Sequence, residues 1–530
     1  MNALDESLSM EKIRILWADD EIDSLKPQVF FLEKKGYDLT TVSNGHDLID
    51  TLAEDSSYDL VFLDESMPGI TGIETLSRIK SRGWTMPVVM VTKNEAENLM
   101  EEAIGSQISD YLIKPINPNQ LLLTIKKLID NKKLVSAKNT SDYQVAFRQL
   151  FMEISDSADH ESWVKIYRQL MQWEFKLDHG SDPEIQQILA QQKQEANIEF
   201  SKFINQHYQK WFEPNAYAPV MSHNLMINKV FKTLSSDVPT IFILLDNLRY
   251  DQWKIIEPII TEKFKVTRED YFYSILPTTT QYSRNSIFAG MLPAEIEKFY
   301  PEWWLNDNEE GGKNLREPDL LGNLVKRVFK PEIRWEYFKV TNTAKGKQLV
   351  DQIHNYLRNN LTAVVYNFID MLSHARTEME VLKELASDEI AYRSLTRSWF
   401  IHSPLWAALQ RIADLPVQLI ITTDHGTIRV QDPSKVIGDR DTTTNLRYKV
   451  GKSLAYEKKD VLEIKDPAKV GLPRPNLSST FIFAKDKNYF LYPNNFSQFM
   501  NYYRNTFQHG GISMEEMICP VIHLRSKNAL

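Results

Sequence analysis

The chain has 530 residues, of which 42% are hydrophobic and 25% charged, a globular composition in a chain too long for one hydrophobic core. Its net charge of −9 and isoelectric point near 5.8 argue against broad binding of duplex nucleic acid, so no direct duplex DNA binding is expected. One cysteine, no signal-peptide pattern and no apolar run of membrane-spanning length favour a cytoplasmic protein without a disulfide framework.

The N-terminal segment alternates apolar strands with amphipathic helices. Five such β/α units follow one another in residues 12–131, which predicts a parallel, doubly wound sheet of flavodoxin-like type. Residues 132–142 are polar and lack periodicity, so we expect a linker there.

The middle of the chain shows no strand pattern. Residues 143–211 carry apolar side chains at helical spacing, and Asp182 followed by Pro183 is typical of a helix start, which predicts a helical bundle or linker domain. Residues 236–530 return to alternating strands and helices and are expected to form one large α/β domain. Within it, residues 299–345 have the pattern of an irregular insertion.

Polar residues follow the ends of the N-terminal strands. They are Asp19, Asp20, Asp64, Thr92 and Lys114. Carboxylates at neighbouring strand ends can hold Mg²⁺, which prefers hard oxygen ligands, while one carboxylate attacks a phosphoryl group. The hydroxyl and the ammonium can then contact the resulting aspartyl phosphate.

This order and spacing resembles the receiver domain of two-component response regulators. The resemblance implies that Asp64 is the phospho-acceptor and that Asp19, Asp20 and Asp64 hold magnesium. It further implies roles in the phosphorylation switch for Thr92, Lys114 and Tyr111, with a cis peptide bond before Pro115. No helix-turn-helix with a basic recognition helix follows residue 131, so the output function has to come from the C-terminal half.

Metal-ligating side chains gather at the ends of hydrophobic segments in the C-terminal half. They are Asp246, Asp370, His374, Asp424, His425 and His509. Asp370, His374 and His509 form a set suited to a catalytic Zn²⁺ with an open position. Asp424, His425 and Asp246, together with a hydroxyl, make a second set, and two close metals would stabilise the attacking and leaving oxygens of phosphoryl displacement.

A run of threonines supplies the candidate nucleophile. Thr278, Thr279 and Thr280 are all available, and the spacing to Ser283, Arg284 and the small-Gly pair ending at Gly290 favours Thr280.

That pattern resembles the alkaline phosphatase superfamily, specifically its phosphodiesterase branch and PglZ domains. The resemblance implies one zinc on Asp370, His374 and His509, and a second on Asp246, Thr280, Asp424 and His425. It also implies phosphate contacts from Asn247 and Arg284. Threonine at the nucleophile position disfavours a sulfatase, and no clear match exists for the further cation of a monoesterase.

The combination of a receiver, a helical region and a PglZ domain resembles the PorX-type response regulators of the Bacteroidota type IX secretion system. That resemblance implies a sensor histidine kinase as partner, a phosphorylation-favoured homodimer, and phosphodiesterase action on cyclic or linear oligonucleotides. It also implies contacts with a secretion motor component and an extracytoplasmic-function sigma factor. The alternative hypothesis is a metal-containing but non-catalytic platform that regulates secretion or transcription by binding partner proteins.

Overall fold

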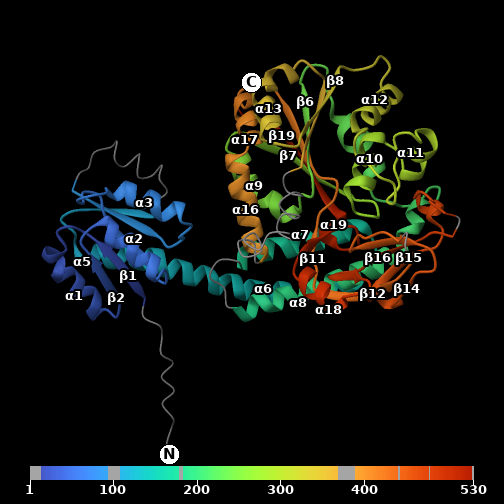
Figure 1. The fold of residues 1–530 in the computed structure, drawn as a ribbon. Coiled ribbons are helices and arrows are strands. Elements are labelled where there is room, and N and C mark those ends of the chain that lie inside the picture. Colours follow the sequence, from blue (N-terminus) through green and yellow to red (C-terminus); the bar gives the residue numbers. More distant parts are fainter. Residues whose placement is uncertain are drawn as a thin grey trace, which may run out of the picture. The chain divides into compact units, whose positions relative to one another are not determined.

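The computed structural model describes residues 13–93, 108–177, 183–367, 388–439, 442–476 and 478–527. The chain divides into two compact units, and the main boundary lies at Tyr143 within helix α6 (Asn131–Asp156) (Figure 1). No helix in the described ranges is long and apolar enough to cross a membrane.

The first unit contains a five-stranded parallel sheet in the order β2-β1-β3-β4-β5. Its strands are β1 (Arg14–Ala18), β2 (Asp38–Val42), β3 (Leu60–Asp64), β4 (Val88–Thr92) and β5 (Asp110–Ile113). Its helices include α1 (Lys26–Lys34), α2 (Gly45–Glu54), α3 (Gly72–Ser81) and α5 (Pro118–Ile125). Successive side chains of β1 point to opposite faces of the sheet, since Ile15 belongs to one hydrophobic cluster and Leu16 to the other. The predicted flavodoxin-like fold is therefore confirmed.

The expected linker at residues 132–142 is helical and ends next to the boundary between the two compact units. Helix α5 leads through a π-helical turn (Lys126–Asp130) into α6, whose 26 residues include the whole segment. The segment lacks Gly and Pro and contains good helix formers such as Lys, Leu and Ala. Missing apolar periodicity removes the signal of a packed face, but it does not prevent a helix that connects two domains.

The middle region is helical, as predicted. After α6 come α7 (His160–Leu177) and α8 (Pro183–His207). Buried aromatic side chains join the two, with the rings of Trp163 and Phe200 5.4 Å apart in an edge-to-face arrangement. Trp163 and Phe200 therefore serve as core packing between the two helices.

The second unit is built on a six-stranded mixed sheet in the order β7-β19-β10-β6-β9-β8. Its strands are β6 (Thr240–Leu245), β7 (Phe264–Tyr273), β8 (Trp335–Val340), β9 (Leu361–Tyr366), β10 (Gln418–Thr422) and β19 (Ile518–Ser526). Strands β10, β6, β9 and β8 run parallel, and β19 is antiparallel to both β10 and β7. Every residue of β6, β9 and β10 is buried, as expected for strands covered on both faces.

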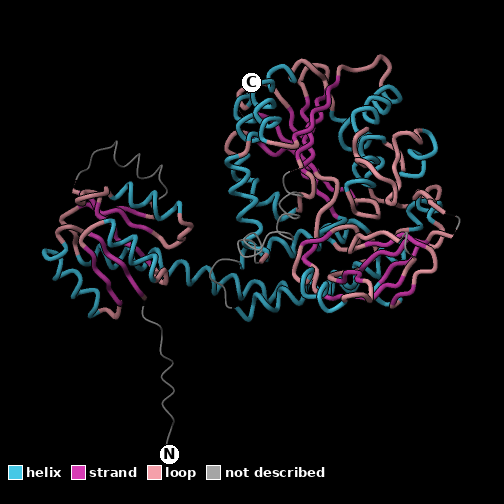
Figure 2. Tube along the Cα trace, in the orientation of Figure 1, coloured by secondary structure: helices cyan, strands magenta, loops and turns pink. Residues whose placement is uncertain are grey.

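Helices cover both faces of this sheet (Figures 1 and 2). One face carries α9 (Tyr250–Ile260), α13 (Thr343–Tyr356), α16 (Glu389–His402) and α17 (Pro404–Ile412). The other carries α10 (Asn285–Ala289), α11 (Pro293–Phe299) and α12 (Glu317–Val328). The predicted α/β output domain is thus a three-layer structure.

Between β10 and β19 the chain forms a group of small sheets. Their strands are β11 (Ile428–Arg429), β12 (Asp432–Ile437), β13 (Tyr448–Gly451), β14 (Ala455–Tyr456), β15 (Val461–Ile464), β16 (Thr480–Ala484), β17 (Asn488–Leu491) and β18 (Phe507–Gln508). Two short helices, α18 (Phe496–Tyr503) and α19 (Met514–Met517), complete this part and bring the chain back to the main sheet.

Candidate metal centres

Three carboxylates meet at the carboxyl ends of β1 and β3 in the first unit. Ligating oxygens of Asp19, Asp20 and Asp64 lie within 4.8 Å of one another, with Asp19 and Asp64 buried and Asp20 exposed. Lys114, which follows β5, places its Nζ 2.8 Å from Asp19 Oδ2 and 3.1 Å from Asp64 Oδ2. The Lys114 ammonium thus pairs with two of the three carboxylates, and this all-oxygen set fits a Mg²⁺ ion.

The electrostatics of Asp64 reflect this crowding. Burial and the neighbouring Asp19 charge raise the pKa of Asp64 to about 6, although Lys114 acts in the opposite direction. A divalent cation would favour the ionised form of this carboxylate, which is the form that can attack a phosphoryl group.

The predicted switch residues surround this cluster. Thr92 is the last residue of β4, and its carbonyl accepts a hydrogen bond from Lys114 N at 2.8 Å. Tyr111 in β5 is 40% exposed. The peptide bond between Lys114 and Pro115 is cis, as expected.

A second cluster of ligating groups is buried at the carboxyl edge of the large sheet. Ligating atoms of Asp246, Asp424 and His425 lie within 4.8 Å of one another. Asp246 directly follows β6, and Asp424 comes two residues after β10. These strands are parallel neighbours, so their carboxyl ends deliver both aspartates to one place.

The imidazole of His425 is oriented as a metal ligand would be. Its Nδ1 lies 3.0 Å from the carbonyl oxygen of Gly426, which can only accept a hydrogen bond, so this contact assigns the proton to Nδ1. Its Nε2 then presents a lone pair at 3.9 Å from both Asp246 Oδ1 and Asp424 Oδ2. An imidazole held by a backbone carbonyl beside two carboxylates fits a Zn²⁺ site.

The three threonines have different surroundings. The Thr280 hydroxyl, at the start of a π-helical turn (Thr280–Arg284), lies 3.2 Å from His425 Nε2 and 3.3 Å from Asp246 Oδ1. The Thr278 hydroxyl instead donates to Gly511 O and accepts from Gly510 N, both at 3.0 Å. Thr279 is buried, and no contact joins its hydroxyl to the cluster. Of the three, Thr280 faces the metal-ligating groups.

His509 is the described member of the other predicted zinc set. Its ring stacks on His425 with centroids 4.3 Å apart, and its Nδ1 lies 3.2 Å from Thr278 O. The structure therefore brings His509 beside the Asp246, Asp424 and His425 cluster. Asp370 and His374 lie outside the described residues.

Arg284 occupies the base of the cluster. Its guanidinium is fully buried, pairs with Asp246, and donates to Asp424 Oδ2 and to Asn367 Oδ1 at 3.0 Å each. Glu317 adds a further carboxylate oxygen at 3.6 Å. This geometry favours a positioning role for Arg284 over the predicted phosphate contact, because its donors are already directed at these side chains.

Asp424 is ionised in this setting. Burial works against the charge, but the Arg284 guanidinium and a hydrogen bond from Asn247 N at 3.3 Å both lower the pKa of Asp424. Asn247 itself is fully buried and has a φ of 66°, in the left-handed region that asparagine tolerates. The Asn247 backbone N–H thus donates a hydrogen bond to the Asp424 carboxylate.

The expectation of an irregular insertion at residues 299–345 is wrong for its second half, which contains α12 and β8, a strand of the main sheet. The irregular part, residues 300–316, is called the insertion here, and it contacts the segment that carries Thr280. Asn314 Nδ2 donates to Thr280 O at 3.1 Å, and Gln281 Nε2 donates to Leu305 O at 2.7 Å. The Asp307 carboxylate accepts hydrogen bonds from Tyr282 and, at 2.6 Å, from Tyr448. Sequence analysis missed these residues, because nothing local in the sequence marks a contact between positions 141 residues apart.

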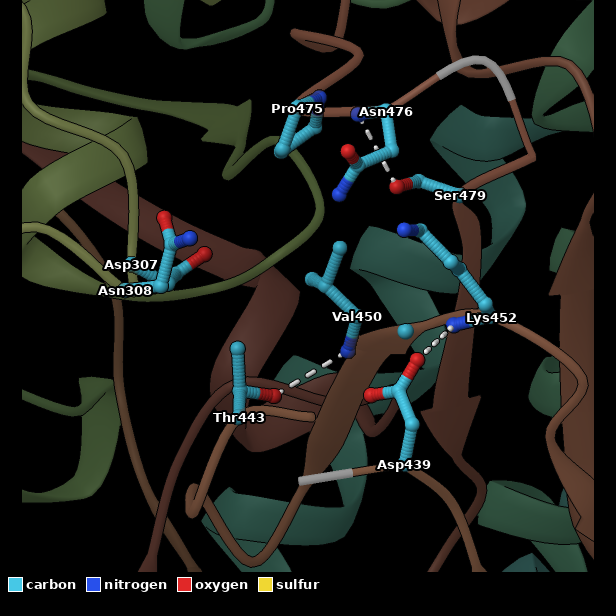
Figure 3. Close-up of a pocket in the computed structure, with 10 residues that line it drawn as sticks. Asp307, Asn308, Asp439, Thr443, Val450, Lys452, Pro475, Asn476 and Ser479 are labelled. Atoms are coloured by element: carbon cyan, nitrogen blue, oxygen red, sulfur yellow. Dashed lines mark hydrogen bonds between the residues drawn. The ribbon is translucent and has the colours of Figure 1, made fainter. Parts of the chain in front are cut away.

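A small polar pocket adjoins Asp307 (Figure 3). Side chains from the insertion, from β13 and from two loops face it. They include Asn308, Asp439, Thr443, Val450, Lys452, Asn476 and Ser479. Its lining is mixed, with amide, hydroxyl, carboxylate and ammonium groups but no cluster of metal ligands among the described residues.

Family models match three consecutive parts of the chain. A response regulator receiver domain matches residues 15–126, a PorX response regulator linker domain matches 133–212, and a BREX system PglZ alkaline phosphatase-like domain matches 225–524. The last match covers more than half of the 530 residues.

Curated relatives are similar to the N-terminal part. The alginate biosynthesis transcriptional regulatory protein AlgB of Pseudomonas syringae pv. tomato is 33% identical over 129 residues, covering 24% of this chain and 29% of AlgB. The transcriptional regulatory protein ResD of Bacillus subtilis is 30% identical over 128 residues, covering 24% of this chain and 52% of ResD. The chain thus spans about a third to a half of the length of these relatives.

Solved structures match a similar share of the chain. The receiver domain of a putative LuxO repressor protein from Vibrio parahaemolyticus is 25% identical, with a TM-score of 0.22 over 23% of this chain and 94% of that chain. The chemotaxis protein CheY4 of Vibrio cholerae is 25% identical, with a TM-score of 0.21 over 22% of this chain and 99% of that chain.

Proposed function

Since the chain belongs to the PglZ alkaline phosphatase-like family and has the domain order of a PorX-type response regulator, we propose that its output domain is a di-zinc phosphodiesterase under receiver control. The receiver is phosphorylated on Asp64 by a sensor histidine kinase. The output domain acts on cyclic or linear oligonucleotides and regulates type IX protein secretion from the cytoplasm.

One observation carries the catalytic part of this proposal. The Thr280 hydroxyl lies within 3.3 Å of both Asp246 and His425, and these two residues, with Asp424, form a buried set of metal-ligating groups. A hydroxyl in contact with such a set is in position to be the nucleophile of phosphoryl transfer.

The residues that would hold the metals follow from the clusters. Asp246, Asp424, His425 and Thr280 would hold one zinc, and His509, with Asp370 and His374 from outside the described residues, would hold the other. When bound, the two ions supply positive charge to the attacking and leaving oxygens of the displacement.

The protein's own groups perform the remaining steps. Asp246 and His425 hold Thr280 Oγ1 toward the bound phosphodiester. Thr280 Oγ1 loses its proton to solvent as it forms a bond to phosphorus, and the leaving oxygen takes up a proton as its bond to phosphorus breaks. Water then hydrolyses the phosphothreonine and restores the hydroxyl. Arg284 keeps the Asp246 and Asp424 carboxylates in place throughout.

The receiver supplies the control in this proposal. Asp19, Asp20 and Asp64 would hold a magnesium ion, and Lys114 and Thr92 would contact the phosphoryl group on Asp64. Phosphorylation would favour a homodimer and change the output through it. A secretion motor component and an extracytoplasmic-function sigma factor are the proposed partners downstream.

A second candidate is the non-catalytic platform. The buried Arg284 guanidinium lies close to the carboxylates of Asp246, Asp424 and Glu317 and offsets part of their negative charge. These buried carboxylates therefore also fit a protein that has no catalytic activity. Such a protein would act by binding partners alone.

Hydrolysis of bis-p-nitrophenyl phosphate with added zinc distinguishes the phosphodiesterase from the non-catalytic platform. We expect turnover by the wild type, its loss in EDTA, and a decrease of roughly 10³-fold in Thr280→Ala, because the nucleophile is removed. Thr279→Ala, a neighbouring threonine whose hydroxyl does not contact the cluster, serves as the matched control and should keep its activity.

Each other outcome is informative. Equal turnover by Thr280→Ala and wild type would move the nucleophile to Thr278, Thr279 or water. Absence of turnover by zinc-loaded wild type would support the platform.

A further inference from the structure

We propose that helix α8 of the middle region is part of the frame of the candidate zinc site. Asn197 and Tyr208 are its positioning residues, the first for the segment that carries His509 and the second for the segment that carries Thr280. The catalytic part of this inference rests on the proposed phosphodiesterase, but its structural part does not.

Asn197 connects α8 to the C-terminal part of the output domain with both ends of its amide. Its Nδ2 donates to Glu515 Oε2 at 2.9 Å, and its Oδ1 accepts from Met514 N at 2.8 Å. The side chain is only 2% exposed, so water cannot readily replace these bonds. Residues more than 300 positions apart are thus held together at the start of α19.

The segment that Asn197 holds lies directly against both candidate histidine loops. Gly426, which follows His425, donates its N–H to Glu516 O at 3.1 Å, and a Cβ at Gly426 would lie 2.0 Å from Glu515 O. Gly511, two residues after His509, donates its N–H to Glu516 Oε1 at 2.9 Å. A shift of residues 514–516 would therefore reach His425 through backbone contacts with Gly426, and His509 through the Glu516 carboxylate and Gly511.

Tyr208, immediately after α8, contacts the segment that carries Thr280. Its hydroxyl accepts a hydrogen bond from Leu276 N at 2.8 Å, and the side chain is 1% exposed. Leu276 lies four residues before Thr280. The intervening Thr278 bonds to Gly510 and Gly511, so the two segments held by α8 are also bonded to each other.

This arrangement gives the middle region a direct route to the site. Helix α8 contacts α6 through Gln192, whose Nε2 donates to Phe147 O at 3.0 Å, and α6 continues from the receiver's last helix. A displacement of α8 against the output domain would change the distance between Thr280 and the histidines without any contact between receiver and site.

Hydrogen exchange tests the structural part with a matched pair of variants. Asn197→Ala removes the amide that reaches residues 514–515, while Gln192→Ala removes a buried amide of the same helix that donates to Phe147 O in α6. We expect Asn197→Ala to raise exchange in residues 509–517 by roughly 10- to 100-fold, the effect of two lost buried hydrogen bonds, and Gln192→Ala to leave it unchanged.

Zinc binding and kinetics test the catalytic part. We expect Asn197→Ala to lower kcat for bis-p-nitrophenyl phosphate by roughly 10- to 100-fold, with little change in KM and weaker zinc binding in a chelator competition. Gln192→Ala should match the wild type in kcat, KM and zinc binding. Tyr208→Phe keeps the ring, removes only the acceptor for Leu276 N, and should lower kcat in the same way.

The outcomes separate the two proposals. If the two amide variants change exchange at residues 509–517 equally, the positioning role of Asn197 is refuted, whatever the activity of the wild type. The wild type could show no turnover while Asn197→Ala still raises exchange at residues 509–517 alone. That result would support the structural role of α8 and refute the proposed phosphodiesterase. Should Asn197→Ala fail to fold, Tyr208→Phe decides by the kcat comparison.

Discussion

Arg284 illustrates how charge is arranged at the level of single residues. Its partners Asp246 and Asp424 are 38 and 140 residues away in the sequence, so no local pattern could reveal that the guanidinium would lie between them. Breaking such a buried pair typically costs about 3–5 kcal/mol, because the remaining charge has no solvent. The sequence predicted that Arg284 belongs to the site, and only the fold shows what it contacts.

A buried carboxylate away from the cluster leads to a prediction about pH. Asp486 is 7% exposed, and burial raises its pKa from 3.8 to about 6 despite the nearby Lys487. Because the folded protein binds this proton more tightly than the unfolded chain, the associated stability is complete below about pH 4 and is lost as pH rises through 6.

Asp486→Asn should therefore raise the free energy of unfolding at pH 7 by about 2–3 kcal/mol and leave it nearly unchanged at pH 4. Urea denaturation at the two pH values measures this, with the exposed Asp432→Asn as control. An equal gain at both pH values would show that the effect is not electrostatic.

At the level of elements, the sequence located strand ends better than strand neighbours. Hydrophobic runs ending in aspartate predicted Asp246 and Asp424 at the carboxyl ends of β6 and β10, and the structure places them there. In the structure β6 and β10 are adjacent, and β19 lies antiparallel beside β10. This strand order depends on contacts between distant segments, so no local sequence pattern could predict it. The same holds for the contacts between the insertion and the Thr280 segment.

Helix α6 yields a prediction at this scale. Ala137 lies inside the helix, where proline removes a hydrogen bond and costs about 3 kcal/mol. We expect Ala137→Pro to leave receiver phosphorylation and basal phosphodiesterase turnover intact but to abolish the response of turnover to a small-molecule phosphoryl donor.

The control for that experiment is Ala137→Gln, which changes the same position while preserving the helix. Turnover assayed with and without the phosphoryl donor measures the coupling. A proline variant that responds like wild type would show that the continuity of α6 does not transmit the signal.

At the level of the whole molecule, the order of an input domain, a helical region and an output domain was predictable because each has its own periodicity. The expected linker was not recognised as a helix, since a polar helix lacks the apolar stripe on which sequence reasoning depends. The full ligand set of the two predicted zinc ions also remains a prediction, because Asp370 and His374 lie outside the described residues.

Coupling between the two ends is tested by the phospho-acceptor. Wild type treated with acetyl phosphate and Mg²⁺ should shift from monomer toward dimer in analytical ultracentrifugation and change its turnover, whereas Asp64→Asn should do neither. The exposed Asp50→Asn is the control and should respond like wild type. A response that survives in Asp64→Asn would place the phosphoryl group elsewhere.

The position of β19 has a consequence for how the protein is made. This strand pairs with both β7 and β10, so the large sheet is incomplete until residues 518–526 have left the ribosome. The receiver's strands lie in residues 14–113 and can pair while the rest is still being translated. Each nascent chain therefore completes its receiver sheet well before the large sheet of its PglZ alkaline phosphatase-like domain, and a polypeptide released early would contain the first without the second.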